Sequence, residues 1–188
     1  MLGNKILETR KSKYNGEIVV KKTLGLGTYI QVGGITQSGK IIEQIWKKAL
    51  KRVKNEKIES CLVLGLGGGS VAGLLRKYFP KAKIIGVEID PVMVGLGKKY
   101  LGLNDNNVEI IIQDAKTYKL PANTYDLVIV DTYLGREYVE IAGALLAGSG
   151  IVMVNKLGSY DENFKKKLEK LFGSVETVEP LANTIYIC

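Results

Sequence analysis

The segment that most constrains this chain is a short apolar run followed by four glycines, Cys61-Leu-Val-Leu-Gly65-Leu-Gly67-Gly68-Gly69-Ser70. The apolar run is typical of a buried β-strand, and the residues from about Ser70 to Tyr78 have the pattern of a helix. Glycines let a backbone approach a ligand without a clash at Cβ, and a helix N-terminus leaves N–H groups free beside them. A tight strand-to-helix turn needs fewer glycines, so the segment predicts a loop that binds a nucleotide or an adenosyl group.

Two acidic residues follow at the ends of the next two apolar runs. Glu88 ends a strand near the spacing from Gly65 at which a carboxylate accepts hydrogen bonds from ribose hydroxyls. Asp90 precedes a proline and is better explained as a helix N-cap. Asp114 can accept from an adenine amino group, and the N–H of Ala115 can reach a ring nitrogen. Asp114 as a plain loop residue is the alternative, and Glu88 with the glycines would also suit NAD.

Apolar runs and helical patterns alternate from residue 60 onward, which predicts an α/β fold with a mostly parallel, Rossmann-like sheet. The expected strands are 61–64, 83–88, 108–112, 126–131, 150–155, 174–178 and 184–187, and the expected helices are 70–78, 91–100, 137–146 and 161–171. The last two strands are too close together for a crossover, so the C-terminal end of the sheet should be antiparallel.

The first forty residues contain short strands, 17–21 and 28–32, punctuated by glycines, and an amphipathic helix is expected over 41–53. We divide the chain into a small N-terminal β element, 1–40, and a Rossmann-like cofactor-binding domain, 41–188.

Composition excludes several kinds of site. The chain has no histidine and only two cysteines, so neither a Cys/His zinc site nor a histidine general base is expected, and no metal is predicted. The net charge is +8 with widely spread lysines, which indicates a solvated basic surface. A cluster on 47–54 leaves nucleic acid open as a partner. Neither an apolar leader nor a membrane-length run occurs, so we expect a cytoplasmic protein without a membrane partner.

Four motifs together resemble the class I S-adenosylmethionine-dependent methyltransferases. They are Gly65-Leu-Gly-Gly-Gly, Val87-Glu-Ile-Asp-Pro, Gln113-Asp-Ala and Val130-Asp131. The branch that the chain resembles most is the spermidine synthase-like one, the polyamine aminopropyltransferases. That branch also opens with a β element, which 7–18 resembles, and has a Gly-x-x-Gln turn, which 34–37 resembles. The likeness runs over nearly the whole chain.

The resemblance implies roles for particular residues and S-adenosylmethionine, or its decarboxylated form, as cofactor. Glu88 would bind the ribose, Asp114 with Ala115 the adenine, and Gln44 would lie in the substrate region. The glycines of the loop would bind the amino-acid part of the cofactor; they are Gly65, Gly67, Gly68 and Gly69.

The chain departs from the aminopropyltransferase pattern at three places. Gly68 stands where those enzymes carry an Asp that anchors the cofactor's amino group. Leu134 stands where their Asp-Ser-x-Asp motif has its second, proton-accepting Asp. Glu43 replaces a substrate-binding Tyr. These departures favour methyl transfer over spermidine synthesis.

Methyl transfer from a sulfonium needs mainly positioning, and an acid–base residue only if the acceptor loses a proton. Asp131 is the expected base, with a structural cap of the following loop as the alternative. Tyr133 would stack on a planar acceptor or pack against the loop. Asn155, Glu43 and Tyr14 are further candidates for contact with the acceptor.

Three functions remain open. The first is methyl transfer to an unidentified acceptor, and it is the one that we prefer. The second is aminopropyl transfer with altered catalytic residues. The third is a non-catalytic homologue that keeps the pocket. Because the chain is basic and Lys156 and Arg136 lie near the site, we expect a neutral or anionic small-molecule acceptor. We expect a homodimer.

Overall fold

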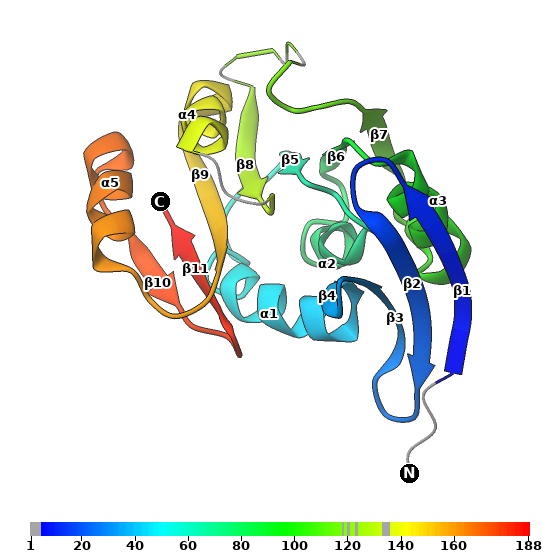
Figure 1. Ribbon diagram of the computed structural model, residues 1–188. Helices are drawn as coiled ribbons and strands as arrows, with labels where there is room; N and C mark the ends of the chain where they lie inside the picture. The colour runs from blue at the N-terminus through cyan, green and yellow to red at the C-terminus, as the bar shows by residue number, and fades with distance from the viewer. Residues whose placement is uncertain (1–4, 118, 120, 123, 133–135) are drawn as a thin grey trace.

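The computed structural model describes residues 5–117, 119, 121–122, 124–132 and 136–188, and for 136 and 137 the backbone alone. It contains a four-stranded sheet, β1-β2-β3-β4, and a seven-stranded sheet, β10-β11-β9-β8-β5-β6-β7 (Figure 1). The small sheet lies beside one end of the large one and is connected to it through a helix.

The small sheet is an antiparallel meander followed directly by the first helix. Its elements are β1 (Lys5–Ser12), β2 (Gly16–Thr23), β3 (Gly27–Val32) and β4 (Ile35–Gly39), and the helix is α1 (Lys40–Leu50). The segment expected as a Gly-x-x-Gln turn is therefore the start of a strand. The boundary between β4 and α1 falls at the proposed division of the chain near residue 40.

The large sheet is parallel from β9 to β7 and antiparallel at β11 and β10, which confirms the predicted fold class. Its strands are β5 (Ser60–Leu64), β6 (Lys83–Glu88), β7 (Val108–Ile112), β8 (Tyr125–Val130), β9 (Leu146–Leu157), β10 (Glu176–Val178) and β11 (Asn183–Ile187). The helical elements that follow α1 are α2 (Ser70–Tyr78), α3 (Pro91–Tyr100), η1 (Leu103–Asn106), α4 (Arg136–Leu145) and α5 (Glu162–Phe172).

Side chains alternate across the large sheet and form a core on each face. On β5, Cys61 and Val63 pack into a cluster with α1 and α2, whereas Leu62 and Leu64 pack into a cluster with α4 and α5. Burial on both faces explains why the parallel strands are continuous apolar runs.

Two expected element boundaries lie three or more residues from the observed ones. The α1 helix ends at Leu50 rather than at 53, because the N–H groups of Arg52 and Val53 bond to carbonyls three residues back, in turns. Val53 stays buried, which is why its apolar character extended the helical pattern. The β9 strand begins directly after α4, at Leu146, where sequence patterning placed the end of the helix. No described helix has the length and apolarity that crossing a bilayer requires.

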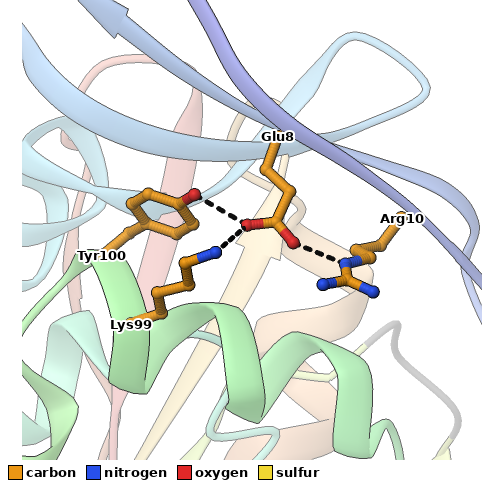
Figure 2. A network of polar contacts seen from close by, with 4 residues as sticks. All are labelled: Glu8, Arg10, Lys99 and Tyr100. Atoms are coloured by element: carbon orange, nitrogen blue, oxygen red, sulfur yellow. Dashed lines mark hydrogen bonds and ion pairs between the residues drawn. The ribbon is translucent and has the colours of Figure 1, made fainter.

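The small sheet packs on α3 through an apolar cluster and a polar network. Ile18, Val20 and Ile30 share a core with Met93 and Leu96 of α3. Beside it, Glu8 of β1 accepts hydrogen bonds from other side chains (Figure 2). The donors are Lys99 Nζ at 2.6 Å, Tyr100 Oη at 2.7 Å and Arg10 Nε at 2.5 Å. They lower the pKa of the Glu8 carboxyl from 4.5 to about 2.

Candidate functional site

A cavity of about 270 Å³ lies at the carboxyl ends of β5, β6, β8 and β9, and the small sheet closes one side of it. Its lining includes Gly65, Glu88 and Asp131, each at or just beyond the end of one of these strands, and Asn155, two residues before the end of β9. Open parallel α/β sheets bind ligands at this edge, and the volume is near the lower limit of about 300 Å³ for small-molecule sites.

The turn after β5 requires glycine at its first position. Gly65 has a φ of 86°, and a Cβ there would lie 2.4 Å from the carbonyl oxygen of Asp131. This glycine therefore brings the ends of β5 and β8 together, and Asp131 N donates to the Leu64 carbonyl at 2.8 Å.

The backbone N–H groups of the loop all donate to acceptors within the protein. They are Gly65 and Leu66 to the Val87 carbonyl, Gly67 to Glu88 Oε2, Gly68 to Ser38 Oγ and Gly69 to the Leu66 carbonyl, at distances between 2.7 and 3.1 Å. None of these five groups is left for an anionic part of a ligand.

Two reciprocal hydrogen bonds join the loop to the small sheet. Gly68 N donates to Ser38 Oγ at 2.7 Å, and Gly39 N donates to Ser70 Oγ at 2.7 Å. Both serines are buried. A Cβ at Gly68 would lie 2.9 Å from Ser38 Cβ, so Ser38 fills the space that a side chain at this position would need. The end of β4 is thus part of the wall of the cavity.

Glu88 stands at the end of β6 with 9% of its surface exposed. Its two carboxylate oxygens accept from Gly67 N at 2.8 Å and from Asp90 N at 3.0 Å. Burial raises the pKa of Glu88, and backbone hydrogen bonds from Gly67, Asp90 and Ile89 oppose that rise. A carboxylate oxygen can accept more than one hydrogen bond, so the side that faces the cavity is free for ligand hydroxyls.

Asp131 faces the cavity and is held from two sides. Its Oδ2 accepts from Trp46 Nε1 at 2.9 Å, and its Oδ1 accepts from Asn155 Nδ2 at 2.7 Å. Burial raises the pKa of this carboxyl, and the two hydrogen bonds oppose the rise. A fixed carboxylate with raised proton affinity is suited to act as a general base.

Asn155 is itself oriented by a neighbouring strand. Asn183 Nδ2 of β11 donates to Asn155 Oδ1 at 2.9 Å, and this leaves the Asn155 amide group to donate to Asp131. The hydrogen bonds from Asn183 to Asn155 and from Asn155 to Asp131 therefore fix the direction in which the Asp131 carboxylate points.

The cavity is acidic although the whole chain is basic. Among the described lining residues, the charged ones are Glu88 and Asp131. Lys156, which sequence reasoning placed near the site, pairs with Asp161 at 3.6 Å and is absent from the lining, and the side chain of Arg136 lies outside the described residues. This local charge favours cationic ligands, in contrast to the expectation drawn from the net charge.

Several residues that the sequence singled out do not line the cavity. Asp114 accepts from Lys116 N at 2.9 Å in the loop after β7, and Ala115 is packed in the core. Glu43 and Gln44 are exposed on α1, and Tyr14 is exposed in the β1–β2 turn. Neither Gly68 nor Gly69 contributes to the lining. Tyr133 lies outside the described residues, as does Leu134.

Sequence reasoning did not identify the contributions of Asn15, Ser38, Trp46 and Asn183. Asn15 and Ser38 come from the small sheet, and nothing in their local pattern indicates contact with a loop distant in sequence. Asn183 had a usable signal, since it is a polar residue at the start of an otherwise apolar strand that neighbours β9.

Residues 61–145 match the protein family described as Methyltransferase domain. A polyamine aminopropyltransferase of Vibrio vulnificus is 31% identical over 115 residues, which cover 54% of this chain and 38% of that protein. A polyamine aminopropyltransferase of Clostridium botulinum is 31% identical over 181 residues, which cover 87% of this chain and 63% of that protein. The chain thus spans less than two thirds of the length of these two relatives.

Solved structures resemble this one over a larger share of their length. Spermidine synthase from Thermotoga maritima superposes with a TM-score of 0.75 at 19% identity, over 97% of this chain and 71% of the other. Human methyltransferase-like protein 13 in complex with SAH gives 0.59 at 22% identity, over 79% and 80%. At these identities the likeness establishes a shared fold.

Proposed function

We propose that this chain, which has the class I S-adenosylmethionine-dependent methyltransferase fold in its spermidine synthase-like form, transfers an aminopropyl group from decarboxylated S-adenosylmethionine to a primary amine. The observation that carries the proposal is the charge of the cavity, in which the described charged residues are the two carboxylates Glu88 and Asp131.

The donor is distinguished from S-adenosylmethionine by its missing carboxylate. The methionine carboxylate of the latter would need a basic side chain or free N–H groups near the loop. The described lining has no basic side chain, and the N–H groups from Gly65 to Gly69 already have acceptors. Decarboxylated S-adenosylmethionine, which has a sulfonium and an ammonium but no carboxylate, therefore suits this lining better than S-adenosylmethionine does. The named relatives support the same choice, whereas the sequence departures had favoured methyl transfer.

In this proposal, donor binding and proton transfer involve residues at opposite ends of the cavity. Glu88 accepts hydrogen bonds from the ribose at one end, and Asp131 takes the proton that the attacking amine must lose at the other. The bound donor supplies an activated carbon beside its sulfonium. Trp46 and Asn155 hold Asp131 in one orientation, which keeps its proton-accepting oxygen in a fixed place. Asp131 thereby replaces the second Asp of the family motif, whose position is Leu134.

Calorimetric titration tests the choice of donor. We expect decarboxylated S-adenosylmethionine to bind at least about tenfold more tightly than S-adenosylmethionine, a difference of about 1.4 kcal/mol. Tighter binding of S-adenosylmethionine, together with methyl transfer to any amine, would contradict the proposal.

Substitution of the base tests the reaction. Asp131→Asn should keep donor binding, because Glu88 holds the ribose at the other end of the cavity, and lower the rate of aminopropyl transfer by about 10²–10⁴-fold. The amide has one oxygen for the two donors Trp46 Nε1 and Asn155 Nδ2, so the rate is measured at a temperature where the variant is folded. Asp105→Asn, at an exposed carboxylate outside the cavity, is the matched control and should retain the full rate. Donor binding without transfer in the unsubstituted protein would indicate the non-catalytic alternative.

A further inference from the structure

The end of the cavity around Asp131 has a polar floor. Thr132 lies beside Asp131, and its Oγ1 is buried without a hydrogen-bond partner. Asn155 and Asn183 complete the floor. A buried hydroxyl without a partner is costly, so Thr132 is suited to bond a polar group that enters the cavity beside Asp131.

Two exposed apolar side chains line the cavity beyond this floor. Asn155 and Leu157 lie on the same face of β9, because side chains alternate along a strand, and Leu157 is about 7 Å farther out at about 3.3 Å per residue. Leu157 is 58% exposed and Ile35 is 47% exposed, although both line the cavity. These two exposed side chains are the apolar part of the mouth of the cavity, and Ile42 is a further apolar residue of its lining.

The mouth has no carboxylate among the described lining residues. If an amine nitrogen lies at Asp131, the second ammonium of a diamine reaches about the level of Leu157. There the ammonium loses hydration against apolar side chains and gains no counter-ion from the described lining of the mouth. An alkyl group at the same place gains apolar contact.

We infer that the acceptor is a primary monoamine with an apolar stem, whose nitrogen lies at Asp131 and Thr132 and whose stem leaves between Ile35 and Leu157. This inference rests on the proposed function and specifies its acceptor. The nitrogen lone pair forms the new bond to carbon, the carbon–sulfur bond breaks with its electron pair going to sulfur, and Asp131 takes the proton from nitrogen.

The experiment compares amines of equal length. Initial rates with decarboxylated S-adenosylmethionine are measured for n-pentylamine and cadaverine, and for n-butylamine and putrescine. Binding of the same amines to the protein saturated with 5′-methylthioadenosine is measured by calorimetry. We expect each monoamine to exceed its diamine by about tenfold in kcat/KM and in affinity, because the second ammonium loses hydration without gaining a partner. Equal values, a preference for the diamines, or binding of none of the four would overturn the inference.

A substitution at the mouth gives an independent test. Leu157→Glu places a carboxylate where the second ammonium would lie, and the exposed position tolerates the change. This variant should reverse the preference in favour of cadaverine. Leu171→Glu adds the same charge at an exposed position of α5 outside the cavity and should leave the preference unchanged. Unchanged preference in Leu157→Glu would also overturn the inference.

Donor titration in the absence of amine separates this result from failure of the proposed function. If decarboxylated S-adenosylmethionine binds and the amine preference is wrong, the acceptor class alone is wrong. If the donor does not bind, the proposed function fails.

Discussion

Glu88 connects the ligand site to the fold at the scale of a single residue. Its carboxylate accepts from Gly67 N in the loop and from Asp90 N at the start of α3, and it faces the cavity. Binding and loop structure therefore depend on the same side chain.

The substitution Glu88→Gln should weaken donor binding by about 2 kcal/mol, roughly thirtyfold in Kd, because a neutral amide is a poorer acceptor for ribose hydroxyls. Stability should also fall by about 1–3 kcal/mol, since only one oxygen remains for two buried N–H groups. Calorimetry at a temperature where the variant is folded checks the affinity, and thermal unfolding without ligand checks the stability. A folded variant with unchanged affinity would remove Glu88 from the binding site.

Gly68 stands where the polyamine aminopropyltransferases that the chain resembles carry an Asp, and a side chain at this position would meet Ser38. A Cβ at this position meets Ser38 Cβ and Oγ at 2.9 Å and Ile30 Cδ1 at 3.0 Å. Gly68→Asp should therefore destabilise the protein by about 1–3 kcal/mol, the usual cost of inserting atoms into a packed region. Gly95→Asp is the control, because a Cβ at Gly95 meets nothing within 4 Å. Equal unfolding midpoints for the two variants would mean that Ser38 does not restrict the loop.

Residues at strand ends were predictable, and their partners were not. Glu88, Asp131 and Asn155 follow apolar runs, and the carboxyl ends of parallel strands necessarily meet at one edge. The contacts of Ser38 and Trp46 depend on how the small sheet and α1 pack, which no local pattern specifies. The charge of the cavity was missed because net charge averages over a surface that the ligand does not touch.

At the scale of elements, the small sheet is held on α3 by Glu8. Its folded pKa of about 2 lies below the ordinary value of 4.5. The stabilising contribution is therefore fully present above pH 4.5 and is lost as the pH falls from 4.5 toward about 2.

Glu8→Gln should accordingly lower the thermal unfolding midpoint at neutral pH, and the difference from the unsubstituted protein should shrink as the pH falls through this range. Glu109→Gln is the control, because Glu109 makes only an exposed ion pair with Lys83, and such pairs contribute little. A difference that stays constant with pH would show that the charge of Glu8 does not hold the sheet.

Element type was easier to predict than element length. The βα alternation identified each strand of the large sheet, because buried parallel strands are continuous apolar runs. The end of α1 and the start of β9 were misplaced where apolar residues continue from one element into the next, at Val53 and Leu146. Apolar side chains do continue past the end of each helix, but hydrophobic periodicity alone does not reveal where the helical backbone conformation ends.

At the scale of the whole molecule, the sheet order brings the ends of β5, β6, β8 and β9 around one cavity, and the small sheet closes it. The fold class and the place of the site followed from the order of the motifs. The choice between methyl and aminopropyl transfer did not, because it depends on which N–H groups and charges remain available once the loop is packed.

The contact between Trp46 and Asp131 has an optical consequence. Trp46 is the only tryptophan of the chain, is fully buried, and donates through Nε1 to Asp131 Oδ2. Indole emission responds to charge beside its N–H, so the intrinsic fluorescence of the unlabelled protein should report the ionisation of this one carboxylate. The emission should titrate at a pH above 3.8, the ordinary pKa of an aspartate, because burial raises the pKa of Asp131. In Asp131→Asn this transition should vanish, and stopped-flow mixing of the unsubstituted protein with donor and amine would then time the arrival of each at the site.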